Sequence, residues 1–164
     1  MNYSVFEVFR IGIGPSSSHT VGPMSAMGSF IAELRNRKLE HHVERVVVEL
    51  YGSLALTGVG HATDFAVISG LLGATPEDAD PQILAERVGE VRRTKRLLFG
   101  GIREIAFSPE TDLLFFRDRM LSEHPNGMIV EAFDELGASL YRNTYFSIGG
   151  GAVLDKTALI ASRR

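Results

Sequence analysis

The order in which helical and strand-like patterns follow one another constrains the fold of this 164-residue chain more than any other feature. The segment 42–53, HVERVVVELYGS, is β-branched and almost continuously apolar, which predicts a strand. A helix is predicted before it, from about Thr20 to Lys38, and another after it, from Gly58 to Leu72. Because these patterns intermix without a regular βαβ rhythm, we predict an α+β fold in which helices cover a mixed or antiparallel sheet.

Local signals define several of the predicted elements. The apolar face of the first helix consists of Met24, Met27, Phe30, Ile31 and Leu34. In a third helix, Asp80 is the predicted N-cap and Pro81 the first residue. The predicted buried stripe of this helix is Ile83, Leu84, Val88 and Val91. Short strands are predicted in GGIREIAFS and DLLFF, and a hairpin of strands 128–133 and 139–148 is joined through DELG. Length and a hydrophobic content of 45% suit one domain, residues 1–164.

Composition excludes several classes of function. The chain has no cysteine, so by itself it cannot hold a disulfide, a zinc–thiolate site or an iron–sulfur cluster. Its net charge of −3 gives no electrostatic footprint for a nucleic-acid partner, and no glycine-rich nucleotide-binding motif follows a strand. We expect a cytoplasmic protein with no membrane partner, because neither a spanning segment nor a signal peptide is recognised.

A single basic run interrupts the otherwise mixed charge pattern. It consists of Arg92, Arg93, Lys95 and Arg96. We interpret it as a solvated helix face, with an anion-binding patch as the alternative.

The first polar motif, IGPSSSHTVGPM, stands directly ahead of the first predicted helix. Ser16, Ser17 and Ser18 precede His19. The free N–H groups of a helix N-terminus and neighbouring hydroxyls can surround an anion such as a carboxylate. An ordinary capped helix after a flexible loop is the alternative, although a cap needs only one hydroxyl.

The second motif, GHATD, lies at the start of the second predicted helix. His61 and Asp64 are three residues apart and therefore share a helix face. A carboxylate beside an imidazole can orient it and raise its basicity, as a general base requires, and Thr63 could donate to a substrate oxygen. The alternative is that Thr63 or Asp64 is a simple N-cap.

The third and fourth motifs are HPNGM and SIGGG. His124 and Asn126 offer polar groups on a tight loop, for which a plain β-turn is the alternative. Ser147 is followed by glycines, including Gly149 and Gly150, that could make room for a ligand or a neighbouring domain. A bulged strand end explains the glycines equally well.

Taken together and in this order, the four motifs resemble the N-terminal, or β, domain of bacterial iron–sulfur-dependent L-serine dehydratases, across essentially the whole chain. The resemblance implies deamination of L-serine to pyruvate and ammonia by the full-length enzyme, an L-serine ammonia-lyase. It also implies a [4Fe–4S] cluster held by cysteines of a separate α domain, with no cofactor in this chain. The isolated chain is therefore expected to be inactive, and the full-length enzyme to be a homodimer.

The resemblance also assigns roles to the motif residues. His61 is the leading candidate for the base that removes the Cα proton, with His19 as the competing candidate, and Thr63 and Asp64 would support it. The remaining candidates would bind substrate or close over it, and they are Ser16, Ser17, Ser18, His124, Asn126, Ser147, Gly149 and Gly150. The same fold is related to the allosteric substrate-binding domain of some D-3-phosphoglycerate dehydrogenases. A regulatory module that binds small anions or amino acids is therefore the alternative function.

Overall fold

The sheet of this α+β domain has five strands in the order β4–β1–β5–β6–β7. The computed structural model describes residues 18–56 and 62–164. The strands of this sheet are β1 Arg45–Tyr51, β4 Leu113–Phe116, β5 Gly127–Phe133, β6 Ser139–Gly149 and β7 Ala152–Asp155. Strands β1 and β4 are parallel, whereas the other neighbouring pairs are antiparallel. The mixed sheet confirms the predicted fold class.

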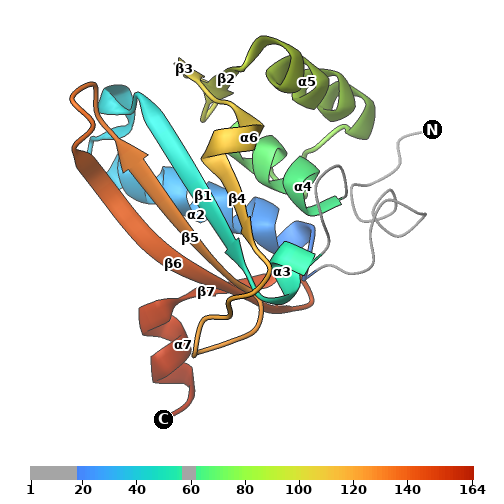
Figure 1. Cartoon of the computed structure of the whole chain (residues 1–164), viewed down its shortest axis with the longest axis vertical. Helices are drawn as coiled ribbons and strands as arrows, with labels where there is room; N and C mark the ends of the chain where they lie inside the picture. The colour runs from blue at the N-terminus through green and yellow to red at the C-terminus, as the bar shows by residue number, and fades with distance from the viewer. Residues whose placement is uncertain (1–17, 57–61) are drawn as a thin grey trace.

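Helices pack on one face of this sheet. Helix α2, Val21–Asn36, lies behind the strands in Figure 1, and α4, Ala62–Leu71, lies against α2. Helix α5, Pro81–Thr94, contacts α4 and the separate hairpin of β2 Arg96–Phe99 and β3 Arg103–Ala106. The short helical elements are η2 Glu40–His42, α3 Ser53–Leu56, α6 Pro109–Asp112 and α7 Lys156–Ser162.

The core between α2 and the sheet follows the predicted apolar faces. All five residues of the predicted α2 face are buried, and Phe30 stacks on Tyr141 of β6 with ring centroids 5.3 Å apart. On β1 the buried residues alternate, and they are Val46, Val48 and Leu50. Pro23 stands in the first turn of α2, where the missing N–H costs no helical hydrogen bond. The predicted helix at 20–38 and strand at 42–53 are both confirmed, with slightly narrower bounds.

Helix α5 begins as predicted, but its buried face is narrower. The Asp80 side chain accepts hydrogen bonds from the N–H groups of Gln82 and Ile83. Ile83, predicted to be buried, is 54% exposed. The reason is that Leu84, Val88 and Val91, spaced four and three residues apart, already face the core, and Ile83 points about 100° away from Leu84.

The basic run does not lie on one helix face, so its interpretation as a solvated helix face is only partly correct. Helix α5 ends at Thr94 because Lys95 adopts a left-handed conformation with φ of 57°, and Arg96 opens strand β2. All four cations have carboxylate partners, which removes support for an anion-binding patch. The pairs are Arg92–Asp64, Arg93–Glu90, Lys95–Glu110 and Arg96–Glu104.

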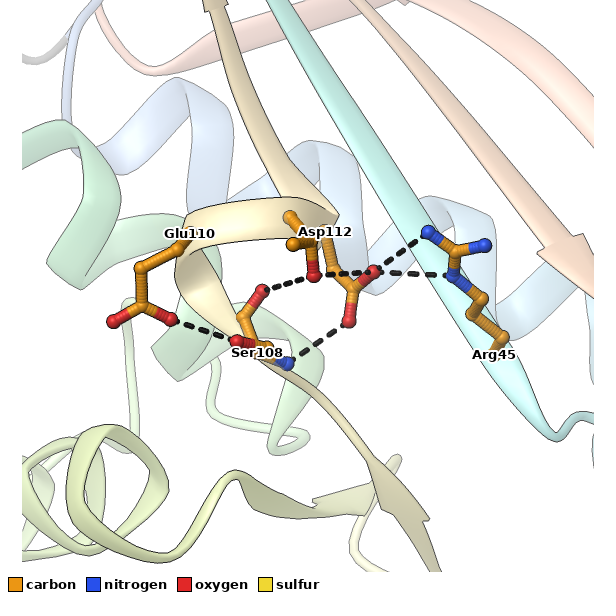
Figure 2. Close-up of polar contacts among 5 residues, drawn as sticks. Arg45, Ser108, Glu110 and Asp112 are labelled. Carbon is orange, nitrogen blue, oxygen red and sulfur yellow. Dashed lines mark hydrogen bonds and ion pairs between the residues drawn. The ribbon is translucent and has the colours of Figure 1, made fainter.

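A polar cluster fixes the parallel edge strand β4 to β1, and Figure 2 shows it. The buried carboxylate of Asp112 accepts from Arg45 Nε at 3.1 Å and from the Ser108 N–H at 2.9 Å. Nearby, the Ser108 hydroxyl donates to Glu110 at 2.7 Å. Hydrogen bonds from Lys95 and then Ser108 lower the pKa of Glu110 to about 2. This cluster therefore has a structural explanation and lies among none of the predicted site residues.

Candidate functional site

The described parts of three of the four polar motifs meet at one end of the sheet. Strand β1 ends there, β5 begins there and β6 ends there, because Leu50 pairs with Met128, and Gly127 pairs with Phe146. Helix α2 also begins at this end, since a Cβ added to Gly151 would lie 2.9 Å from Val21 Cγ1. In Figure 1 the starts of α2 and α4 lie on the same side of the molecule as α3. Motifs separated by more than a hundred residues thus share one region.

His19 is connected to this region through Nε2, and its Nδ1 contacts the neighbouring Ser18. Its Nε2 lies 3.1 Å from the carbonyl oxygen of Ser53, and its Nδ1 lies 3.0 Å from Ser18 Oγ. Because a carbonyl oxygen only accepts, Nε2 carries the proton of neutral His19, and Nδ1 accepts from the Ser18 hydroxyl. Sequence reasoning missed Ser53, whose only local signal is its place after Gly52 at the end of β1.

The HPNGM turn is held by its own histidine. His124 Nδ1 accepts from the Asn126 N–H at 3.0 Å, and the carbonyl of Pro125 accepts from the Ser53 N–H at 3.0 Å. Ser53 therefore joins this turn to His19. Burial, with a smaller contribution from the Arg163 charge, lowers the pKa of His124 below its ordinary value of 6.5. The geometry and the pKa both favour a neutral ring that accepts at Nδ1.

This arrangement predicts a loss of stability on acidification. The pKa of His124 is lower in the folded than in the unfolded chain, so below about pH 6.5 the unfolded chain binds more protons. The free energy of unfolding should therefore fall as the pH drops through that value. Above it, His124 should add no pH dependence, because its ring is neutral in both the folded and the unfolded chain. We expect His124→Asn, which keeps an acceptor, to remove this part of the pH dependence. Urea unfolding of both proteins between about pH 5 and about pH 8 measures the difference; identical slopes would contradict the prediction.

Asn126 of this turn is hydrogen-bonded to Ser147 near the end of β6. Asn126 Nδ2 donates to the Ser147 carbonyl at 3.2 Å, and the Ser147 N–H donates to the Asn126 carbonyl at 3.0 Å. Ser147 is fully buried. Two side-chain atoms of this pair, Asn126 Oδ1 and Ser147 Oγ, are buried without a hydrogen-bond partner. Buried polar atoms are normally paired, so this pair requires an explanation.

The glycines after Ser147 form the tight turn between β6 and β7. Gly149, Gly150 and Gly151 have φ values of 103°, 62° and 82°, which side-chain-bearing residues rarely adopt. The β6–β7 register shifts between Ser147 and Gly149, as in the predicted bulged strand end. Any role of Gly149 and Gly150 toward a ligand stays a prediction.

The described part of the GHATD motif is buried in helix α4. Thr63 is fully buried and Asp64 is 1% exposed. Asp64 Oδ1 accepts from the Phe65 N–H at 2.8 Å, and its Oδ2 pairs with Arg92 Nη2 of α5 at 3.0 Å. Sequence reasoning missed Arg92 as a partner of this motif, because the basic run predicts a solvated side chain at this position.

The predicted candidates Ser16, Ser17 and His61 lie outside the described residues. The five residues 57–61 connect α3, whose first residue contacts His19, to α4. Whether His61 lies beside Asp64 and His19 therefore stays a prediction.

Two surface cavities lie away from all of these residues. One of about 340 Å³ lies between α5 and the β2–β3 hairpin, and one of about 350 Å³ lies between η2 and the β5–β6 turn. Neither is lined by a predicted site residue.

The residues of the chain do not fit an iron–sulfur cluster. The sequence has no cysteine, and within residues 18–56 and 62–164 no group of three histidine or acidic residues could hold a metal ion. A cluster needs thiolate ligands or a set that replaces them. In the part of the chain that the structure describes, no helix is long and apolar enough to cross a membrane.

Fold and geometry together define a small mixed-sheet domain that gathers histidines and buried polar groups from distant loops at one sheet end. The sequence model of the family described as serine dehydratase beta chain matches residues 4–158, and the chain therefore belongs to this family. The resemblance inferred from the four motifs is thereby confirmed.

Individual relatives agree with the family. An L-serine dehydratase of Streptomyces coelicolor is 47% identical over 163 residues, covering 99% of this chain and 36% of the relative. An L-serine dehydratase of Haemophilus influenzae is 44% identical over 154 residues, covering 93% of this chain and 34% of the relative. L-serine dehydratase 2 of Escherichia coli is 46% identical over 156 residues, covering 93% of this chain and 33% of the relative. The chain thus spans about a third of the length of the curated relatives it matches.

Proposed function

We propose that this chain is the part of an L-serine dehydratase that binds the substrate and removes its Cα proton, while a separate α part holds a [4Fe–4S] cluster. Membership of the serine dehydratase beta chain family supports the substrate class. The lengths of the relatives support a division of labour, because two thirds of each relative lies beyond the matched region. The absence of cysteine supports placing the cluster outside these 164 residues.

The strongest support for the proposal is the set of hydrogen bonds that connects three motifs at one end of the sheet. His19 contacts Ser53, Ser53 contacts the Pro125 carbonyl, and the adjacent Asn126 contacts Ser147. A fold needs no such gathering of histidine, amide and hydroxyl groups for its core. An enzyme that must hold a zwitterion and move a proton needs these groups.

The chemistry of the substrate assigns a role to each group. L-serine must lose its Cα proton and its β-hydroxyl, and the resulting aminoacrylate tautomerises and hydrolyses to pyruvate and ammonia. We assign the base to His61, because the imidazole group is the side chain best suited to proton transfer near neutral pH. Thr63 and Asp64 would support it from the buried first turns of α4. Ser16, Ser17 and Ser18 would hold the substrate carboxylate at the N-terminus of α2.

His19 serves this proposal better as a positioning residue than as the base. Its Nδ1 already accepts from Ser18, and its Nε2 donates to Ser53. A base needs a free lone pair directed at Cα, so His19 would have to give up one of these contacts first.

Reconstitution tests the proposal directly. The chain is combined anaerobically with a cluster-bearing α part, and pyruvate formed from L-serine is measured. We expect turnover only from the combination and none from either part alone. Turnover by the isolated chain would contradict the proposal. Binding of L-serine without turnover in the combination would instead favour the regulatory module.

A further inference from the structure

The orientation of the Asn126 side chain is fixed by its partner. Its Nδ2 donates to the Ser147 carbonyl at 3.2 Å, and a flipped amide would set two carbonyl oxygens against each other. Asn126 Oδ1 is therefore an acceptor without a donor, and the neighbouring Ser147 Oγ is also buried without a partner. The structure thus presents two unpartnered polar atoms from adjacent chain segments.

Ser147 lies on the face of the sheet that packs against α2, at the end where α2 begins. Side chains alternate along a strand, so Ser147 shares a face with Tyr145 and Tyr141. That face is packed against α2, since Phe30 stacks on Tyr141. The turn that follows Ser147 reaches the first residue of α2, because Gly151 lies against Val21. The chain segment that carries Ser147 therefore continues directly to the N-terminus of α2.

The N-terminus of α2 and the pair Asn126 Oδ1 and Ser147 Oγ favour groups of opposite charge. The N-terminus of α2 favours a negative group, because the peptide dipoles of its 16 residues add along the axis. Asn126 Oδ1 and Ser147 Oγ offer lone pairs, which favour a donor, and a charged donor forms the strongest such hydrogen bonds. An α-amino acid carries a carboxylate and an ammonium on one carbon, so it matches both preferences at once.

We propose that Asn126 Oδ1 and Ser147 Oγ are the acceptors for the α-ammonium group of an amino-acid substrate. The proposal rests on the function proposed above and adds the subsite that recognises the amino group. Both atoms are shielded from solvent, so a ligand reaches them when the turn 124–127 shifts. A buried water is the competing partner, and it would give no preference for an ammonium group.

The test compares two ligands that differ in the amino group. KM for L-serine and the inhibition constant of 3-hydroxypropanoate, which lacks the ammonium, are measured for the chain combined with its α part. In Ser147→Ala we expect KM for L-serine to rise about tenfold, as for loss of a charge-assisted hydrogen bond. The inhibition constant of 3-hydroxypropanoate should change by less than about twofold.

Ser69→Ala is the matched control. Ser69 Oγ is the other unpartnered buried side-chain atom in the described part of the chain, and it lies in α4 away from this pair. Its removal should leave both constants unchanged. Equal effects of Ser147→Ala on both ligands, no effect on either, or a Ser69→Ala variant with the same discrimination would overturn the proposal. If Ser147→Ala does not fold, Asn126→Ala carries the same expectation.

A separate measurement distinguishes failure of the proposed function from failure of the proposed ammonium subsite. If the wild-type combination forms no pyruvate, the dehydratase function fails, and the subsite is then tested by calorimetric titration of both ligands. Tighter binding of L-serine than of 3-hydroxypropanoate, lost in Ser147→Ala, supports the subsite. Binding of both ligands with equal affinity, or of neither, overturns it.

Discussion

In the chain combined with its α part, His61→Ala is expected to lower kcat for L-serine by roughly 10²- to 10⁴-fold, the usual contribution of a positioned base. A base that removes the Cα proton acts in the transition state, so the proposed role predicts that KM changes far less than kcat. Steady-state pyruvate formation measures both constants. With L-serine deuterated at Cα, the isotope effect on the residual rate should grow, because proton removal becomes the slowest step.

Two further histidines serve as comparisons. His41→Ala should be neutral, since the His41 side chain is 76% exposed and distant from the site. His19→Ala should mainly raise KM, because His19 joins Ser53 to Ser18, to which the proposal assigns a role in substrate binding. Normal turnover in His61→Ala together with abolished turnover in His19→Ala would transfer the base to His19. The structural contacts of His19 argue against that outcome.

Elements with strong local signals could be predicted from the sequence. Helix α2 follows from five apolar residues at helical spacing and from Pro23 in its first turn. Helix α5 follows from Asp80 and Pro81, and the hairpin follows from strands on either side of Asp134–Gly137. In each case the decisive interactions join residues close in sequence, so their spacing carries the information.

Elements that depend on distant partners could not be predicted in this way. Strand β2 begins at Arg96, the last residue of the basic run, and it is defined by pairing with β3 rather than by its own pattern. The parallel pairing of β4 with β1 joins residues more than sixty positions apart. Propensity gives no information about such pairings.

The candidate site shows the same difference between features that are local in sequence and contacts between distant residues. The motif residues were recognised from their types and order. Their contacts could not be predicted, because Ser53 and His19 are 34 positions apart in the sequence and Arg92 and Asp64 are 28 positions apart. The unpartnered state of Asn126 Oδ1 and Ser147 Oγ depends on the complete packing of this sheet end, which only the three-dimensional structure contains.

The position of α4, and with it Thr63 and Asp64, depends on one close contact with α2. A Cβ added to Gly70 would lie 2.7 Å from Met27 Cβ and 2.8 Å from the Met24 carbonyl oxygen. Atoms this close cannot be accommodated by rotating a side chain, because one of them belongs to the backbone. Gly70 therefore permits the two helices to approach, and the approach places the buried groups of α4 beside the beginning of α2.

Gly70→Ala is accordingly expected to destabilise the domain by about 1–3 kcal/mol, the range for overpacked cores. This loss should outweigh the gain of up to about 1 kcal/mol in helix propensity that alanine brings. Gly89→Ala isolates that gain, since Gly89 lies in α5 with no atom within 4 Å of an added Cβ, and it should stabilise by about 0.5–1 kcal/mol. Urea unfolding compares the two variants. Displacement of α4 should also lower kcat in Gly70→Ala, because misplacing a catalytic group by about 1 Å can cost about 10²-fold in rate. Equal stabilisation by both substitutions would contradict the close contact between α4 and α2 at Gly70.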